Sequence, residues 1–414
     1  MQEKKQIASK EIYDTLKICN FCTRSIGISL IGDVPKTIKG RLKTYVTLFI
    51  TFVFTLLLIF GEYAYIVGQM MTSTLIEDLI GSNLHVAGYG TMSFGKLITI
   101  WYKRHTFRKL VVELAEIWPV TIKDKQAAFI KKDSLTALNQ RQIMYTFWNV
   151  MGMLFYNLTP IATLIYNKLR GAPSQLGYVW QLAYPFDKTK PIYHELVYVF
   201  ETCAGVLSVC NMLGSDLLFM TMASHISMLL RLLQVKIRNI MSTDDECNLK
   251  NQLDNNGSHD TFEEIMSVVK FHQRLINYIN DLENAFCVVN LINVLLSSVN
   301  ICCVVFTIVF LEPWLEMSNK FFLGAALTQM GIVCWYADDI YRASIGVADA
   351  VYESGWYKTD ARCRRALLLV LQRSQKPLYF TALKFRDITM TTYSSILTSA
   401  YSYFTLLYSS YNKN

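Results

Sequence analysis

Hydrophobic residues gather in long blocks along this chain, and polar, basic stretches separate the blocks. Each block is close to the length of about 20 residues that an α-helix needs to cross the hydrocarbon core of a bilayer. We therefore expect an all-α integral membrane protein in which residues 1–414 form a single seven-helix membrane domain. The expected crossings are Thr44–Ile66, Leu79–Trp101, Ile143–Tyr166, Leu196–Met220, Phe286–Leu311, Phe321–Tyr336 and Ile388–Tyr408.

The basic residues predict the orientation of the chain. Of 40 Lys and Arg residues, 33 fall in segments that would share one side of the membrane, and 6 fall in the other loops and the C-terminal tail. Because cytoplasmic loops carry the excess of Lys and Arg, we expect a cytoplasmic N-terminus and an extracellular C-terminus. This orientation is opposite to that of a G-protein-coupled receptor, and it explains the positive charge without a nucleic-acid partner. The basic segments are 1–43, 102–142, 221–285 and 342–387.

The segments 221–285 and 342–387 also carry helical patterns that continue the fourth, fifth and sixth crossings into the cytoplasm. Their apolar residues recur at steps of three and four, and such faces must be buried against something. One another, the membrane surface and neighbouring subunits are the choices, with packing within the chain as the default. A pore would also need contacts between subunits, so we expect the extensions to form an intersubunit anchor. The stripe that follows the fourth crossing is Ile226, Leu229, Leu230, Leu233, Ile237 and Ile240.

The last crossing, within residues 388–410, is long enough to span a bilayer but is rich in hydroxyl groups. Ser395, Ser399, Ser402 and Ser409 recur at steps of four, three and seven, which places them on one helical face together with Leu406. A helix that lines a water-filled path needs such a polar stripe, and one bulky apolar residue on it could close the path by dewetting. The alternative is that the hydroxyls bond back to their own helix or pack against neighbouring helices.

The motif content argues against an enzyme. The sequence contains no HExxH, P-loop, GxSxG or Rossmann glycine set, so we expect no catalytic residues, no cofactor and no metal. Glu201 and Asp216 lie within the fourth crossing, which allows two interpretations. One is functional, a wet vestibule or a ligand pocket, and the other is structural, interfacial snorkelling or an internal hydrogen bond. Aromatic and Met residues are frequent in the outer halves of the crossings and could line an apolar cavity with a few polar groups. The candidates are His85, Tyr89, Met153, Phe155, Tyr156, Tyr198, Phe200 and Thr202.

Two stretches carry a pattern of motifs. One is Tyr184-Pro185-Phe186-Asp187 followed by Pro191, Tyr193, Glu195 and Tyr198. The other extends from Cys334-Trp335-Tyr336, through Ser344, Ala350, Tyr352, Trp356, Gln375, Pro377 and Phe385, to the terminal Ser399-Ala400-Tyr401-Ser402-Tyr403-Phe404-Thr405-Leu406-Leu407. Both stretches resemble the insect odorant receptor family. The chain departs from the family pattern at Ala337-Asp338-Asp339, Glu201 and Arg386. It also lacks the C-terminal pattern of the shared co-receptor Orco, so it resembles a ligand-tuned subunit.

The resemblance implies a ligand-gated, non-selective cation channel in the plasma membrane of olfactory neuron dendrites. It also implies a heterotetramer with Orco and contact with membrane lipid. A small volatile ligand would bind in the outer half of the helix bundle, and the last crossing would line the pore, with Leu406 at its apolar gate. A gustatory-type channel of the same superfamily is the first alternative, although its last crossing would be expected to end differently. A G-protein-coupled receptor is the second.

Overall fold

The computed structural model describes residues 2–30, 37–72, 84–171, 176–248, 257–311 and 317–411. The described chain is almost entirely helical, and its two short strands, β1 (Thr381–Ala382) and β2 (Arg386–Asp387), pair antiparallel just before the last helix. The helices are α1 (Gln2–Thr15), α2 (Lys17–Ser25), α3 (Ile38–Thr72), α5 (Leu84–Tyr102), α6 (Arg104–Ile117), α7 (Lys125–Leu169), α8 (Pro191–Asn248), α9 (Gly257–Phe306) with a π-helical turn (Thr307–Leu311), α10 (Ser318–Glu353), a 3₁₀ turn (Trp356–Lys358), α11 (Ala361–Ser374) and α12 (Met390–Tyr411).

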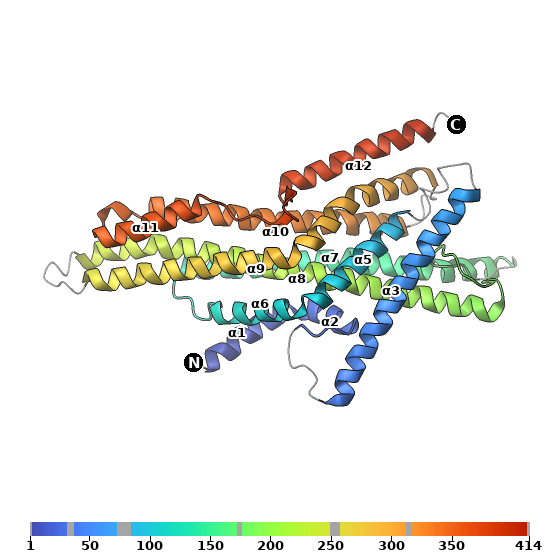
Figure 1. Cartoon of the computed structure of the whole chain (residues 1–414), viewed down its shortest axis with the longest axis horizontal. Helices are drawn as coiled ribbons and strands as arrows, with labels where there is room; N and C mark the ends of the chain where they lie inside the picture. Colours follow the sequence, from blue (N-terminus) through green and yellow to red (C-terminus); the bar gives the residue numbers. More distant parts are fainter. Residues whose placement is uncertain are drawn as a thin grey trace.

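The lengths of four helices determine the elongated shape of the molecule. α7, α8, α9 and α10 contain 45, 58, 50 and 36 residues. At 1.5 Å per residue α8 is about 87 Å long, far more than the hydrocarbon core of about 30 Å. Figure 1 shows these helices side by side along the long axis, with α3, α5 and α12 at one half and α11 at the other. We call these the seven-helix half and the α11 half.

As far as the chain is described, each expected crossing coincides with helical residues of the seven-helix half, apart from Ile388 and Thr389 at the start of the last one. Length and composition alone identify three described helices as able to cross a membrane: Ile38–Met71, Ile192–Ile240 and Thr261–Phe310. The second expected crossing is described only from Leu84, so its first residues, 79–83, lie outside the described residues. α12 begins at Met390 rather than Ile388, because Arg386–Asp387 is paired in the β-hairpin that precedes it.

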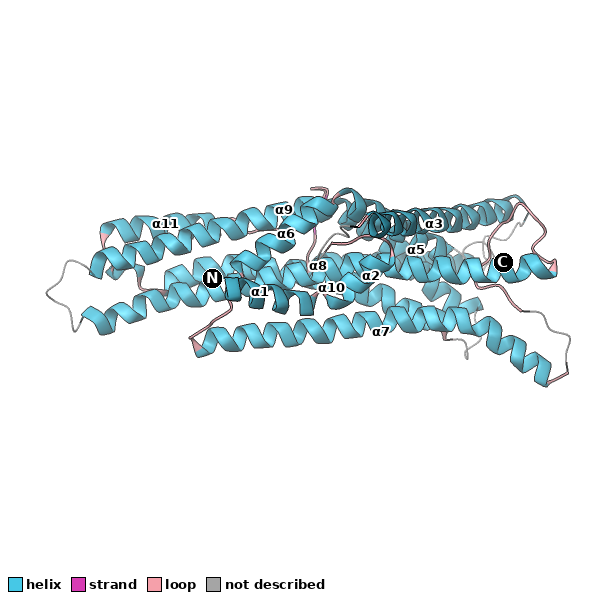
Figure 2. Cartoon of the chain, turned by 90° about the horizontal axis from the view of Figure 1, so that it is seen from below, coloured by secondary structure: helices cyan, strands magenta, loops and turns pink. Residues whose placement is uncertain are grey.

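The α11 half is held together by an apolar core formed within the chain. All six residues of the stripe after the fourth crossing are buried, from Ile226 to Ile240, and Ile265, Leu275, Ile279 and Leu282 of α9 are buried in the same cluster. The default expectation that these faces pack within the chain is therefore confirmed. Figure 2 shows α7 along one edge of the bundle and α9 with α11 along the other. Part of α11 is left uncovered, since Leu368 and Leu369 are exposed.

The sequence analysis left segment 1–43 and the loop 102–142 without secondary structure, but both contribute helices. α1 buries Ala8 and Ile12, α2 buries Cys19, and Leu16 is buried between the two helices; these residues recur at helical spacing and enter the same core. α2 lies against α8, where the Cys19 thiol donates to the Gly214 carbonyl at 3.3 Å. Residues 125–142 extend the third crossing in the same way that other extensions lengthen the fourth, fifth and sixth.

Candidate functional site

A cavity in the seven-helix half lies between five helices and one loop. α3, α5, α7, α8 and α10 each contribute, and Trp180 enters from the segment between α7 and α8. The wall is mostly apolar and aromatic, with a few polar groups, as is usual for a small-molecule site. The lining residues are Leu58, Glu62, Val86, Tyr89, Gly90, Trp148, Asn149, Gly152, Met153, Tyr156, Asn157, Trp180, Gly205, Ser208, Val209, Phe322 and Ala325.

Three of the eight candidates named from the sequence line this cavity: Tyr89, Met153 and Tyr156. Aromatic contacts hold two of them in place, because the rings of Tyr89 and Phe322 lie 5.3 Å apart and those of Tyr156 and Trp180 lie 4.6 Å apart. Such pairs add to the packing energy of a site and fix ring orientation. These residues stay predicted ligand contacts.

The other five candidates lie behind the lining or away from it. His85 is buried and shares Asn319 with Tyr156, since its Nε2 lies 3.1 Å from Asn319 Oδ1 and Tyr156 also donates to that oxygen. Phe155 stacks on Phe321 at 4.9 Å, and the Tyr198 hydroxyl donates to the Asn157 carbonyl at 2.6 Å. Phe200 packs against Phe54, and the Thr202 hydroxyl is buried without a hydrogen-bond partner among the described residues. His85 and Tyr198 thus support lining residues indirectly.

Sequence reasoning missed Glu62 and Trp180. Glu62 is the only charged residue within the first expected crossing, and this position was a usable signal because a charge inside a membrane helix is costly and usually functional. Trp180 carried no such signal, since it belongs to a loop. Its place depends on Glu201, whose buried carboxylate accepts from the backbone N–H of Val179 at 2.8 Å and of Trp180 at 3.0 Å.

Glu201 therefore fixes the loop that closes the cavity. The Tyr184 hydroxyl also donates to this carboxylate, at 2.9 Å. Burial, the negative charge of Glu201 and this hydrogen bond raise the pKa of the Tyr184 hydroxyl, so Tyr184 remains a donor. The loop also contacts α3, where the Ala183 N–H donates to the Gly61 carbonyl at 3.1 Å. Of the two interpretations of Glu201 drawn from the sequence, the structure favours the internal hydrogen bond.

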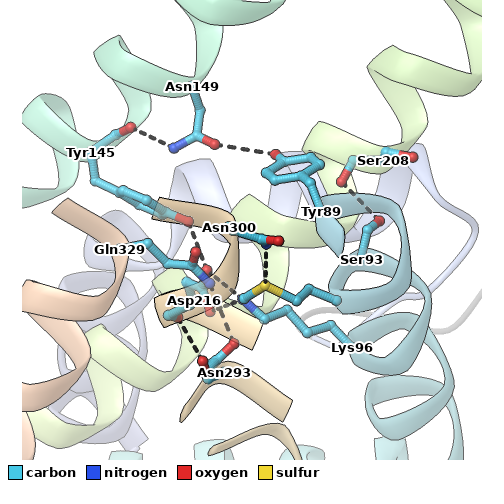
Figure 3. A network of polar contacts seen from close by, with 12 residues as sticks. Tyr89, Ser93, Lys96, Tyr145, Asn149, Ser208, Asp216, Asn293, Asn300 and Gln329 are labelled. Atoms are coloured by element: carbon cyan, nitrogen blue, oxygen red, sulfur yellow. Dashed lines mark hydrogen bonds and ion pairs between the residues drawn. The ribbon is translucent and has the colours of Figure 1, made fainter. Parts of the chain in front are cut away.

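A polar chain leads from the cavity to a buried ion pair (Figure 3). Tyr89 donates to Asn149 Oδ1 at 3.3 Å, and Asn149 donates to the Tyr145 carbonyl at 2.9 Å. The Tyr145 hydroxyl donates to Asp216 at 2.6 Å, and Lys96 Nζ lies 2.7 and 2.8 Å from the two oxygens of Asp216. Lys96 and Asp216 are both buried, and each compensates the charge of the other. For Asp216 too, the structure favours the internal interaction over a wet vestibule.

The predicted pore helix, α12, packs on the bundle with one face only. Ile396 and Ala400 are buried, while Ser402, Leu406 and Ser409 are exposed on this chain. Ser395 and Ser399 are half-buried. The hydroxyls of Ser399 and Ser402 bond back to carbonyls one turn earlier, at 2.9 and 3.0 Å, which was the alternative considered from the sequence. Such back-bonding leaves each serine oxygen able to accept another hydrogen bond, so the exposed face remains polar.

Comparison with known proteins identifies the family. The sequence model described as "7tm Odorant receptor" matches residues 78–401, which is most of the chain. The chain belongs to the 7tm odorant receptor family. Odorant receptor 85c of Drosophila melanogaster is 25% identical over 403 residues, covering 96% of this chain and 99% of the relative. Odorant receptor 85b of the same species is 24% identical over 356 residues, covering 85% and 87%.

The fold is that of a solved odorant receptor. The olfactory receptor OR5 of Machilis hrabei, determined in complex with eugenol, matches with a TM-score of 0.79 at 16% identity, covering 97% of this chain and 98% of that one. A second structure of the same receptor matches with a TM-score of 0.77 at 16% identity, covering 96% of this chain and 98% of that one. This odorant receptor is therefore an all-α membrane protein with the seven-helix fold, and its relatives are receptors rather than enzymes. The family match favours an odorant receptor over the gustatory-type and G-protein-coupled alternatives.

Proposed function

We propose that this odorant receptor is one subunit of a ligand-gated, non-selective cation channel. A small volatile ligand occupies the cavity lined by Tyr89, Met153 and Tyr156, and ions pass beside α12. The N-terminus and the α11 half lie in the cytoplasm, and the C-terminus lies outside. The site of action is the plasma membrane of olfactory neuron dendrites.

The observation that carries the proposal is the division of α12 into two faces. Ala400 is 3% exposed against the chain's own core, whereas Leu406 is 69% exposed on the face that also holds Ser402 and Ser409. A helix that faced only lipid would have no need for a hydroxyl stripe on its uncovered side. In a ring of subunits this face lines a wet path, and Leu406 narrows it to an apolar constriction that gates by dewetting.

One helix connects the cavity with the pore helix. α10 lines the cavity with Phe322 and Ala325, and its Leu327 carbonyl accepts a hydrogen bond from Tyr393 of α12 at 3.3 Å. A ligand that binds the open arrangement more tightly than the closed one shifts the equilibrium toward opening. Ala325 in the cavity wall is only two residues from Leu327, which contacts α12, so movement of α10 at the cavity is passed directly to α12.

We further propose that the channel is a heterotetramer with the Orco co-receptor. One chain supplies only one hydroxyl-lined helix, so a pore needs several chains. The exposed apolar side chains of the α11 half offer a surface for them, since Tyr352, Tyr357, Leu368 and Leu369 are uncovered on this chain. Segment 342–387 acts in this assembly as the cytoplasmic anchor, and segments 1–43 and 221–285 lie on the same side of the membrane.

Replacement of Leu406 by Ala tests the proposed function. Leu406→Ala, co-expressed with Orco, is expected to raise the current recorded without ligand because the constriction widens and wets. Leu407→Ala is the matched control, since Leu407 is packed against the chain's own core. An unchanged basal current in Leu406→Ala at normal surface expression would contradict the gate.

A further inference from the structure

Glu62 of α3 lies in the wall of the cavity and has no hydrogen-bond partner in the part of the chain that the structure describes. The residue is 1% exposed, and neither carboxyl oxygen contacts a donor among the described residues. Gly90 of α5 leaves room for the group, because a Cβ at that position would lie 3.0 Å from Glu62 Oε2. A carboxylate buried in apolar surroundings is strongly unfavourable unless it is paired. Such a group in a ligand cavity points to a partner that the ligand brings.

Three more polar groups of the same wall lack partners among the described residues. They are Asn157 Oδ1, the Ser208 hydroxyl and the Trp180 ring N–H. Asn157 Oδ1 and Glu62 accept hydrogen bonds, Ser208 can accept or donate, and only Trp180 is restricted to donating. The unsatisfied groups are therefore mainly acceptors, and a ligand that complements them must carry several donors on one small group.

The rest of the wall suits a cation. Trp148, Trp180, Tyr156 and Phe322 contribute aromatic rings, and a cation over such a ring is attracted to its face. The described lining contains no Lys or Arg that could pair with Glu62. The buried lysine of this region, Lys96, is engaged with Asp216. The described lining thus offers Glu62 no cationic partner, and a cationic ligand would supply one.

We propose that the cavity recognises a small primary amine with an apolar body. The ammonium group pairs with the Glu62 carboxylate and donates its remaining N–H groups to acceptors such as Asn157 Oδ1 and the Ser208 hydroxyl, while the body packs among the aromatic rings. This proposal rests on the proposed function only in taking the cavity as the ligand site. It assigns to Glu62 the role of selecting amines over alcohols and hydrocarbons of the same shape.

A matched series of ligands tests the assignment on the purified full-length receptor. 2-Phenylethylamine, 2-phenylethanol and ethylbenzene share one body and differ in the terminal group. Binding is followed by tryptophan fluorescence, to which Trp148 and Trp180 of the cavity wall respond. The wild-type receptor is expected to bind the amine at least about tenfold more tightly than the alcohol, because a hydrogen bond between charged groups contributes more binding free energy than a hydrogen bond between neutral groups. Equal affinities for the amine and the alcohol would overturn the proposal.

Glu62→Gln keeps the shape of the side chain and removes its charge. It is expected to abolish the preference for the amine while leaving the affinity for ethylbenzene unchanged. Its thermal stability without ligand should not fall, because no partner among the described residues loses a contact. Glu195→Gln is the control, since Glu195 is exposed on α8 and does not line the cavity. An amine preference that survives in Glu62→Gln would contradict the role of Glu62.

Currents recorded with Orco separate this inference from the proposed function. If the amine binds in a Glu62-dependent way but evokes no current, the amine site stands and the channel proposal fails. If other volatiles evoke currents and the amine is not preferred in binding, the channel proposal stands and the amine site fails.

Discussion

The buried ion pair between Lys96 and Asp216 offers a quantitative test of how the seven-helix half is held together. Lys96 Nζ lies 2.7 and 2.8 Å from the two oxygens of Asp216, and both residues are almost completely buried. Lys96→Met and Asp216→Leu each remove one charge with little change in side-chain volume. The double variant removes both. Removing one partner of a buried pair costs about 3–5 kcal/mol, whereas replacing both with apolar residues is often close to neutral.

The surroundings of the pair predict which single variant is worse. In Lys96→Met the remaining Asp216 keeps the hydrogen bond from Tyr145 at 2.6 Å, and a hydrogen bond to a charged group contributes about 1.5–3 kcal/mol. In Asp216→Leu the remaining Lys96 has no other hydrogen-bond or ion-pair partner among the described residues. We therefore expect Lys96→Met to cost about 3 kcal/mol, Asp216→Leu about 5 kcal/mol, and the double variant less than either.

The assay is unfolding of the purified receptor in detergent, followed by tryptophan fluorescence, with surface expression as a second measure. The coupling energy is the stability lost in the double variant minus the sum of the stabilities lost in the two single variants. Single variants that each lose less than about 1 kcal/mol, or a double variant whose loss equals the sum of the single losses, would refute the reasoning.

Two other predictions concern the loop over the cavity and the packing of α5. Three donors share the two carboxylate oxygens of Glu201, and Glu201→Gln leaves them a single acceptor oxygen. The variant should therefore lose about 1–3 kcal/mol of stability and bind ligand more weakly, because Trp180 is no longer held in place, whereas Glu195→Gln should change neither property. Normal ligand affinity in Glu201→Gln would contradict this role. Gly88→Ala should lower stability by about 1–3 kcal/mol, because a Cβ there would lie 1.9 Å from Asn300 Oδ1 of α9. Gly68→Ala is its control, since a Cβ at Gly68 meets no atom within 4 Å. Equal melting temperatures for the two alanine variants would show that α5 and α9 are not tightly packed.

The sequence was sufficient to predict the parts of the fold that depend on local pattern. The expected crossings follow from runs of apolar residues, and the buried stripe from Ile226 to Ile240 follows from helical periodicity. α1 was missed because its composition is polar, although Ala8 and Ile12 on its buried face and Leu16 just after its end recur every four residues. That periodicity was readable and would have identified the helix.

The candidate site was only partly predictable because it depends on contacts between distant segments. Tyr89, Met153 and Tyr156 line the cavity together because α5 and α7 face it from different sides, which no local pattern encodes. The partner of Asp216 is Lys96, 120 residues earlier, and a single sequence does not reveal such a pairing. Trp180 reaches the cavity only because Glu201 holds its loop.

Cysteine accessibility along α12 tests the central claim most directly. Ser395→Cys, Ser402→Cys and Ser409→Cys are made in a Cys203→Ser background, because Cys203 is exposed, and each is co-expressed with Orco. Ala400→Cys on the buried face is the control. A positively charged thiol reagent applied from outside during agonist exposure is expected to reduce the current irreversibly in the serine-position variants and to leave Ala400→Cys unaffected. If the reagent alters none of the serine-position variants, or alters Ala400→Cys equally, α12 does not line the ion path through its serine face.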